Sequence, residues 1–286
     1  MEYRLLGRTG FKVSILALGG CGPGVTPNPE EGLRAFENAI EKGINIVDIA
    51  PSYGEAEIRL GQLISRNRNR LVITEKTLER TREGAWRELE QTLSRLNVRY
   101  LDVYQFHAVS TLEELEKIFS EDGALKAFLE AREQGLIRFI GITAHSDMRI
   151  VVKALERFDF DTVLIPVSVG SIIHPAPEND FKPVLKMADE RDIGVIAIKA
   201  IARRRWGGEK KYQTWYEPLE DQEDIDKAVW FTLSQDPVAT YSMACDIRLW
   251  PKVISAGERF RKLSLDDQEG VINYFRNKDI QPLFPS

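Results

Sequence analysis

Short apolar stretches alternate with amphipathic ones along almost the whole chain. Runs rich in β-branched residues lie near Ile15, Ile44, Leu71, Leu101, Ile137, Thr162, Val195 and Val238. The stretches between them have helical spacing and span residues 30–42, 55–66, 82–96, 123–134, 148–158, 179–191, 222–235 and 246–260. In the third of these, Ala85, Leu89 and Leu96 fall on one stripe, as they do in an amphipathic α-helix. Because the strand runs are apolar on both faces, the pattern predicts a parallel sheet covered by helices.

Eight strand–helix units fit a closed (β/α)8 barrel, an architecture that takes about 250 residues. We therefore predict one α/β domain, a TIM barrel, over residues 1–286. The alternative is a doubly wound open sheet, which usually carries a glycine-rich phosphate-binding turn after its first strand. Residues 19–24 are rich in glycine, but their spacing differs from that turn. Pro23 and Pro27 are also expected to prevent a helix from starting there.

Three segments lie outside the repeating pattern. Residues 1–14 are expected to form a β-hairpin that caps one end of the barrel, since two short strand-like runs flank a Gly-Arg-Thr-Gly turn. Residues 203–218 form a long polar and aromatic loop after the seventh strand, and such loops are usually functional or mobile. Residues 264–286 are expected to add one extra helix, over 265–276, and a tail.

Composition excludes several classes of protein. The 286 residues are 43% hydrophobic and 29% charged, with a net charge of −5, which argues against nucleic acid or an anionic membrane as a partner. No apolar run approaches the roughly 18 residues needed to span a bilayer, and the first residues lack the features of a signal peptide. Cys21 and Cys245 are far apart and lack metal or redox spacing. This favours a reduced, cytoplasmic protein in which Cys21 serves packing.

Ionisable residues follow three consecutive strands. Asp48 ends the second strand, and a Pro-Ser turn then presents Tyr53. Lys76 ends the third strand, and His107 follows the fourth. Because the carboxyl ends of barrel strands converge on one face, these four side chains are expected to lie together.

This set of side chains suits the reduction of a carbonyl group. A phenol has a pKa near 10 and is a poor acid at neutral pH, but a neighbouring ammonium such as that of Lys76 lowers that pKa. Asp48 would hold the lysine charged, and His107 would orient the carbonyl oxygen or relay the proton. None of these groups can deliver a hydride, so the site requires a nicotinamide cofactor.

The chain resembles the aldo-keto reductases over almost its whole length. The resemblance rests on residues 3–10, on the Asp-Ile-Ala-Pro-Ser-Tyr-Gly run at 48–54, on Lys76, and on the histidine of Gln-Phe-His at 105–107. It implies a (β/α)8 barrel that uses NADPH, with NADH possible, to reduce aldehydes or ketones to alcohols. It also implies that Tyr53 is the proton donor, that Lys76 and Asp48 tune it, and that His107 orients the substrate.

The cofactor side departs from the family pattern, which suggests a divergent branch that resembles the family's prokaryotic oxidoreductases. Thr143 stands in place of the serine after the fifth strand, Ala144 cannot replace the asparagine, and His145 is expected to compensate. The aromatic residue that stacks on nicotinamide after the seventh strand is missing from residues 196–200, and Lys199 in this run is expected to meet the pyrophosphate or a substrate anion. The predicted cofactor contacts are Gly20, Cys21, Thr143, His145, Ser168, Lys199, Arg203 and Arg248.

The sequence offers two alternatives to a reductase. In a barrel metallohydrolase, His107 and His145 would be ligands, but the three histidines are scattered and Lys76 would repel a cation, so no metal is predicted. The second alternative is a nucleotide-binding regulatory or scaffolding subunit with little turnover. It is suggested by the absence of the aromatic residue that stacks on nicotinamide and of the side-chain amide that the family uses to hold the cofactor. The expected partner is a small carbonyl compound, bound by a monomer or a small homo-oligomer.

Overall fold

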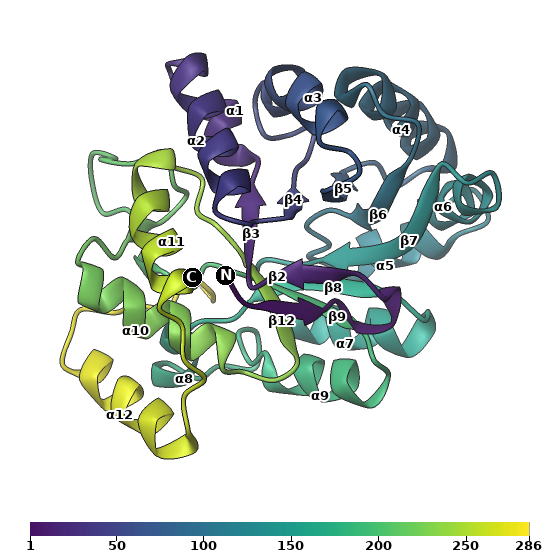
Figure 1. Cartoon of the computed structure of the whole chain (residues 1–286). Coiled ribbons are helices and arrows are strands. Elements are labelled where there is room, and N and C mark those ends of the chain that lie inside the picture. Colours follow the sequence, from purple (N-terminus) through teal and green to yellow (C-terminus); the bar gives the residue numbers. More distant parts are fainter. Residues whose placement is uncertain (286) are drawn as a thin grey trace.

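Eight parallel strands close into a barrel in the computed structural model, which describes residues 1–285. The strands are β3 (Leu16–Gly19), β4 (Ile46–Asp48), β5 (Val72–Thr77), β6 (Leu101–Phe106), β7 (Ile137–Thr143), β8 (Thr162–Pro166), β9 (Gly194–Ile198) and β12 (Val238–Ser242). The last strand pairs with both the first and the seventh, which closes the sheet (Figure 1). The predicted barrel is therefore confirmed, and the open-sheet alternative is wrong.

Helices surround the barrel at the predicted places. They are α2 (Pro29–Glu41), α3 (Ala56–Arg66), α4 (Arg82–Leu96), α6 (Ala124–Glu133), α7 (Met148–Arg157), α9 (Lys182–Glu190), α10 (Gln222–Leu233), α11 (Trp250–Glu258) and α12 (Leu265–Arg276). Several starts are fixed by side-chain caps: Asn28, Thr81 and Asp221 each accept a hydrogen bond from a backbone N–H of the first turn. Such caps satisfy donors that have no partner within the helix.

Three helices were not predicted: α1 (Cys21–Val25), α5 (Leu112–Phe119) and α8 (Val169–Ile173). The expectation that proline prevents a helix after the first strand is wrong. Pro23 occupies the first turn of α1, where backbone N–H groups have no intrahelical partner and a missing one costs little.

The N-terminal hairpin covers the amino ends of the barrel strands. Its strands β1 (Tyr3–Leu5) and β2 (Lys12–Ser14) are antiparallel and flank the short helix η1 (Gly7–Thr9). Leu6 and Val13 are fully buried in an apolar cluster with Ile46, Val72 and Ala239 from the barrel interior. The hairpin therefore supplies the apolar floor of the barrel and leaves the opposite end for a site.

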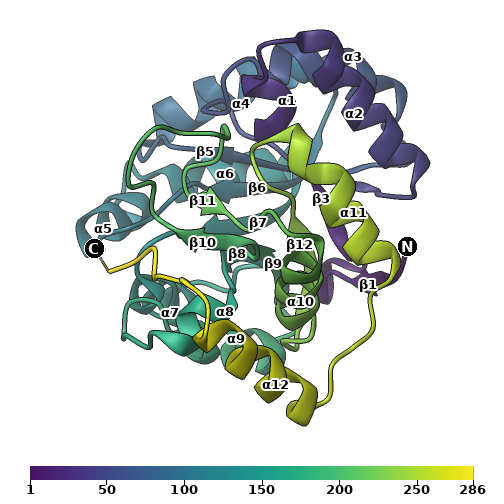
Figure 2. The ribbon, with the colours of Figure 1, turned by 90° about the vertical axis from the view of Figure 1, so that its left-hand side faces the viewer.

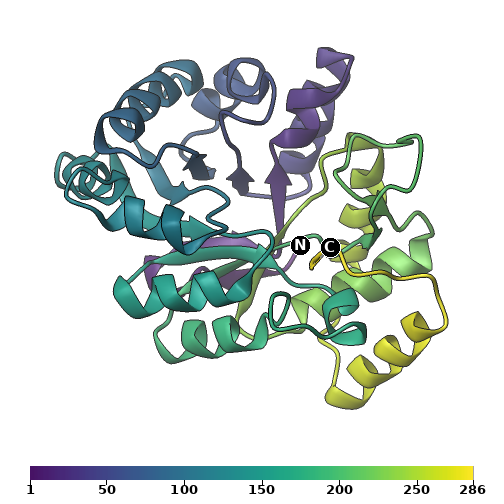
Figure 3. The ribbon, with the colours of Figure 1, turned by 180° about the vertical axis from the view of Figure 1, so that it is seen from behind.

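The C-terminal tail crosses that opposite end. Gln281 donates its backbone N–H to the carbonyl oxygen of Arg203 over 2.8 Å, and His174 Nε2 lies 2.8 Å from the carbonyl oxygen of Ile280. Figure 2 shows the two termini on opposite sides of the molecule, and Figure 3 shows the tail from behind. The predicted segment 264–286 contains α12 and this tail, with Ser286 outside the described residues.

The segment 203–218 is not wholly irregular. It includes most of a short antiparallel pair, β10 (Ala202–Arg204) with β11 (Glu217–Pro218). The guanidinium groups of Arg203 and Arg204 both contact the carboxylate of Glu217, at 3.0 and 2.8 Å. These charge pairs fix the base of the loop beside the seventh barrel strand. Within residues 1–285, no helix combines the length and apolar character that crossing a bilayer requires.

Candidate active site

The four predicted catalytic side chains meet at the carboxyl end of the barrel. Asp48 ends β4, Tyr53 follows in the turn before α3, Lys76 lies in β5 and His107 follows β6. Strand β5 pairs in parallel with both β4 and β6, so the ends of these three strands are neighbours. All four side chains are buried, with Tyr53 the most accessible at 6% exposed.

Asp48 and Lys76 form a buried ion pair. Lys76 Nζ lies 2.6 Å from Asp48 Oδ1 and donates a hydrogen bond to the carbonyl oxygen of Ile49 over 3.0 Å. Asp48 also accepts bonds from the Ser242 hydroxyl at 2.9 Å and the Thr74 hydroxyl at 3.3 Å. Burial alone would lower the pKa of Lys76, but the charge of Asp48 and its hydrogen bond to the ammonium contribute to a net upward shift. Lys76 is therefore charged at neutral pH.

Tyr53 lies against this ammonium. Lys76 Nζ is 4.6 Å from the centroid of the phenol ring. The expected lowering of the phenol pKa is not the net result: burial raises the pKa of Tyr53 to about 12, and Lys76 offsets only part of that shift. The hydroxyl is therefore protonated at neutral pH and has a proton to give.

His107 lies beside Tyr53, with ring centroids 5.8 Å apart. Its Nδ1 is 3.4 Å from the Ser52 hydroxyl, and its backbone oxygen accepts a 2.6 Å bond from Arg80. Burial, together with the charges of Lys76 and Arg80, lowers the pKa of His107 to about 3. A neutral imidazole at this place can hydrogen-bond an oxygen without carrying charge.

Four of the predicted cofactor residues border the cavities at this end of the barrel. Cys21, His145 and Lys199 line a cavity of about 60 Å³ together with Tyr53. Ser168 lines a neighbouring cavity that also includes Lys199 and His145. His145 is half-buried, its two ring nitrogens are inaccessible to solvent, and neither nitrogen has a hydrogen-bond partner among residues 1–285.

Two more of the predicted cofactor residues form hydrogen bonds with the segments that carry Asp48 and His107. The backbone N–H of Gly20 donates to the carbonyl oxygen of Asp48 over 2.8 Å. The hydroxyl of Thr143 accepts a 2.8 Å bond from the backbone N–H of Ala108, which fixes the chain just after His107. Both residues therefore shape the strand ends that carry the site.

Arg203 and Arg248 are not brought to the cavities that contain Tyr53 or Lys199. Arg203 is paired with Glu217 at 3.0 Å and Asp279 at 3.4 Å, and Arg248 is paired with Asp246 at 2.6 Å. Carboxylates thus already neutralise both guanidinium groups. The sequence could not reveal this, because the carboxylates that hold Arg203 lie in later segments of the chain.

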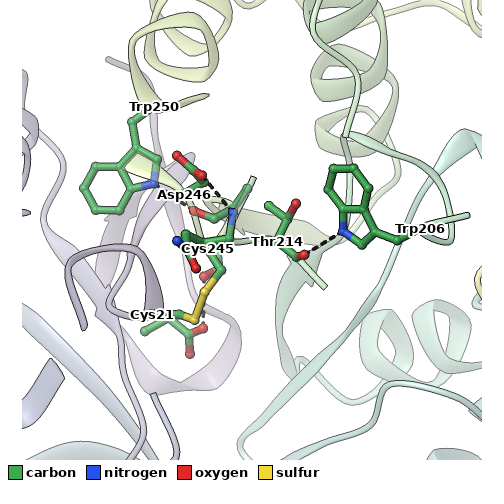
Figure 4. The surroundings of a disulfide bond; sticks show 10 residues. Cys21, Trp206, Thr214, Cys245, Asp246 and Trp250 are labelled. Carbon is green, nitrogen blue, oxygen red and sulfur yellow. Dashed lines mark hydrogen bonds between the residues drawn. A yellow bond between two sulfur atoms is a disulfide. The ribbon is translucent and has the colours of Figure 1, made fainter. Parts of the chain in front are cut away.

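The prediction that both cysteines are reduced is wrong for this structure. Cys21 and Cys245 form a disulfide, with Cα atoms 4.9 Å apart although 224 positions separate them in sequence (Figure 4). Closure of the barrel explains the meeting, because Cys21 follows β3, Cys245 follows β12, and these strands pair. The disulfide borders the same cavity as Tyr53, so Cys21 lies at the site, as predicted, but is bonded to Cys245 and is not a free thiol.

Two residues beside the site were missed by sequence reasoning. Ser242 holds Asp48, and its position at the end of the eighth strand was a usable signal, since strand ends converge. Trp215 lies with its ring centroid 6.4 Å from that of Tyr53 and 6.0 Å from that of His145. The sequence indicated that the loop at 203–218 is functional or mobile, but it did not distinguish Trp215 from the other aromatic residues of that loop.

A closed (β/α)8 barrel with buried ionisable side chains at the carboxyl ends of its strands has the design of a TIM-barrel enzyme. A model described as the aldo/keto reductase family matches residues 16–266. The chain therefore belongs to the aldo/keto reductase family, which is a family of oxidoreductases. This confirms the resemblance to that family inferred from the sequence.

Similar proteins agree with this assignment. The oxidoreductase YqkF of Bacillus subtilis is 26% identical over 217 residues, which cover 71% of this chain and 66% of that protein. L-galactose dehydrogenase of Arabidopsis thaliana is 27% identical over the same shares of the two chains. The match thus spans just under two thirds of these relatives. A solved aldo-keto reductase of Bacillus halodurans, in its holo form, is 19% identical, with a TM-score of 0.76 over 100% of this chain and 99% of that one. It shares the fold.

Proposed function

We propose that this protein is an NAD(P)H-dependent reductase of aldehydes or ketones, with Tyr53 as the proton donor. The observation that carries the proposal is the buried contact of Tyr53 with the Lys76 ammonium, 4.6 Å from the ring centroid, beside a neutral His107. When bound, the reduced nicotinamide supplies the hydride. The residues of the chain bind and orient the carbonyl group and supply the proton.

The proton would pass from Tyr53 to the carbonyl oxygen as negative charge develops there. An alkoxide is a stronger base than a phenolate, so transfer remains favourable with a phenol pKa of about 12. Lys76, held by Asp48, would stabilise the phenolate left behind. His107 would orient the carbonyl oxygen through a hydrogen bond.

The residues at the reactive end fit a nicotinamide nucleotide. The ring nitrogens of His145, which lack a hydrogen-bond partner among residues 1–285, suit an amide, and the Lys199 side chain beside them suits an anion, either a phosphate of the cofactor or an acidic group of the substrate. We propose that Gly20, Cys21, Thr143 and Ser168 complete this end of the cofactor site. Arg203 and Arg248 would contribute only after leaving their carboxylate partners. NADPH rather than NADH as the preferred cofactor remains a prediction.

The wider expectations also stay predictions: a small carbonyl compound as the substrate, and a monomer or small homo-oligomer as the assembly. The cytoplasm as the location is likewise a prediction. The Cys21–Cys245 disulfide weighs against it, because disulfides persist mainly in oxidising compartments.

The test is to compare the wild type with Tyr53→Phe against a panel of aldehydes and ketones, with NADPH binding followed by fluorescence. We expect the variant to lose a factor of about 100 or more in turnover, since it lacks the general acid, and to bind NADPH as the wild type does. Tyr104→Phe is the matched control, because Tyr104 is also buried but lies outside the cavities of the site. NADPH binding without Tyr53-dependent turnover would instead favour the regulatory or scaffolding subunit.

A further inference from the structure

A cleft next to the catalytic side chains combines apolar walls with positive charge. It has a volume of about 710 Å³, and His107, His145 and Trp215 lie in its wall. Lys199, Arg205 and Lys210 also line it, whereas no aspartate or glutamate does among residues 1–285. On a chain with a net charge of −5, three cations without a carboxylate around one cleft mark it as a place for an anion.

Lys199 is the unusual member of this group. It is 8% exposed, and its Nζ donates a hydrogen bond to the carbonyl oxygen of His145 over 3.2 Å. No carboxylate in the described chain forms an ion pair with it, in contrast to Arg203, Arg204 and Arg248. A buried charge without a counter-ion is costly. Burial and the nearby Arg205 accordingly lower the pKa of Lys199 to about 7.

The surroundings of Lys199 also contain unused hydrogen-bonding capacity. Both ring nitrogens of His145 are inaccessible to solvent and lack a hydrogen-bond partner among the residues that the structure describes. The Nζ of Lys199 lies 4.7 Å from the ring centroid of Phe284, in the C-terminal tail. The guanidinium carbon of Arg205 lies 5.4 Å from the same ring, so one aromatic side chain from the tail sits beside both cations.

The backbone at Lys199 supports a functional role. Its φ is +64°, a left-handed conformation that costs free energy for a residue with a long side chain. Such strain persists where the surrounding structure requires it, and it is common at functional sites. Here it occurs directly after β9, at the strand end where the barrel places its chemistry.

We propose that this cleft binds carbonyl substrates that carry a carboxylate and an apolar or aromatic body, with Lys199 and Arg205 as the anchor for the carboxylate. The inference rests on the proposed function, because His107 and the cleft would receive the carbonyl group of the same molecule. It assigns Lys199 to the substrate rather than to a phosphate of the cofactor. Trp215 and Leu78, which are 56% and 52% exposed, supply apolar surface for the body of the substrate.

The first experiment compares para-carboxybenzaldehyde with its methyl ester. The wild type is expected to prefer the acid in kcat/KM by about tenfold or more, as a charge-assisted contact in a buried site should provide. Lys199→Met should abolish most of this preference, while Lys199→Arg should keep much of it and Arg205→Gln should reduce it less. Lys186→Met, an exposed lysine paired with Glu190, is the control and should keep the preference.

The outcomes separate the possible sources of the anion. Equal use of acid and ester by the wild type would overturn the proposal. So would a Lys199→Met variant that keeps the preference but binds NADPH more weakly by fluorescence titration, because the anion would then be the cofactor's phosphate. Retention of the fold by each variant is checked by circular dichroism.

A failure of the proposed function would look different. If neither aldehyde is reduced, the cleft is tested by calorimetry with para-methoxybenzoate and the neutral para-methoxybenzamide. Tighter binding of the benzoate by the wild type, lost in Lys199→Met, supports the anion site without any turnover. Equal binding of the two probes contradicts it.

Discussion

Among single residues, Asp48 occupies the most demanding position, because it is the carboxylate paired with a fully buried lysine. We predict that Asp48→Asn lowers the free energy of unfolding by about 3–5 kcal/mol, since it leaves the Lys76 ammonium buried without a partner. Urea unfolding measures the change. The double variant Asp48→Asn, Lys76→Met removes both charges and should recover part of the loss. A single variant as stable as the wild type would show that the pair is not buried as described.

Burial of His107 is expected to make the free energy of unfolding of the protein depend on pH. The unfolded chain takes up a proton at this residue with a pKa near 6.5, whereas the folded protein does so only at about 3. Between these two values only the unfolded state carries the proton, so the free energy of unfolding falls as the pH drops, by up to about 1.4 kcal/mol for each pH unit.

The measurement is a series of urea transitions at several pH values for the wild type and for His107→Gln. The variant lacks the titrating group, so its stability should fall less steeply below about pH 6.5. Parallel curves for the two proteins would mean that His107 titrates normally in the fold and is not held neutral by burial.

At the residue scale, the sequence predicted that the four proposed catalytic side chains lie together, but not that two of the proposed cofactor contacts, Arg203 and Arg248, are paired with carboxylates. Asp48, Tyr53, Lys76 and His107 were predictable because strand ends in a barrel converge whatever their separation in sequence. Arg203 and Arg248 were not, because their electrostatic partners depend on tertiary contacts. Positive charge in a sequence does not reveal whether a carboxylate already neutralises it.

Among the elements, the loop between β9 and α10 has the clearest role, since it carries Trp215 to the site. The loop is held by a 2.8 Å bond from Trp206 Nε1 to the carbonyl oxygen of Thr214 and a 2.9 Å bond from the backbone N–H of Gln213 to Asp246. Figure 4 shows Trp206, Thr214 and Asp246 in this arrangement.

We predict that Trp215→Ala raises KM for an aromatic aldehyde by about tenfold, because the variant loses a large aromatic contact in the cleft. The midpoint of thermal unfolding should change little, since the side chain is 56% exposed and exposed positions contribute little to stability. Steady-state kinetics and a thermal melt measure the two effects. Trp86→Ala, in α4 and hydrogen-bonded to Glu90, is the control. A large loss of stability in Trp215→Ala would indicate a structural role instead.

The helices that sequence analysis missed show where pattern recognition fails. Helix α5 had usable signals, because Thr111 caps it and Leu112, Leu115 and Ile118 follow helical spacing. The predicted pattern has one helix between consecutive strands, and the helix at 123–134 was already placed between the fourth and the fifth strands. A second helix in the same connection was therefore not expected. Helix α8 spans five residues, which is too short for any period to be recognised.

For the whole molecule, the Cys21–Cys245 disulfide joins the first and the last strands of the barrel. Because it closes a loop across 224 positions, the chain-entropy model of cross-linking sets a ceiling of about 5 kcal/mol on its contribution to stability. We predict that the double variant Cys21→Ser, Cys245→Ser loses about 2–5 kcal/mol of this stability, measured by urea unfolding without reductant.

Reductant provides the internal control for this prediction. Dithiothreitol should lower the stability of the wild type toward that of the double variant and should leave the variant unchanged. If the wild type is insensitive to reductant and as stable as the variant, the two sulfurs are not bonded in solution. No spacing rule predicts this pair from the sequence, because only the closure of the barrel brings its two ends together.

The two ends of the chain lie on opposite sides of the barrel, with the hairpin at the amino ends of the strands and the tail beside Lys199. Purification tags and fluorescent fusions therefore have different consequences at the two termini. A fusion at Met1 would project away from the cleft. An affinity tag placed after the tail would stand at the entrance used by incoming compounds, so kinetic work is best done on protein extended only at its amino terminus.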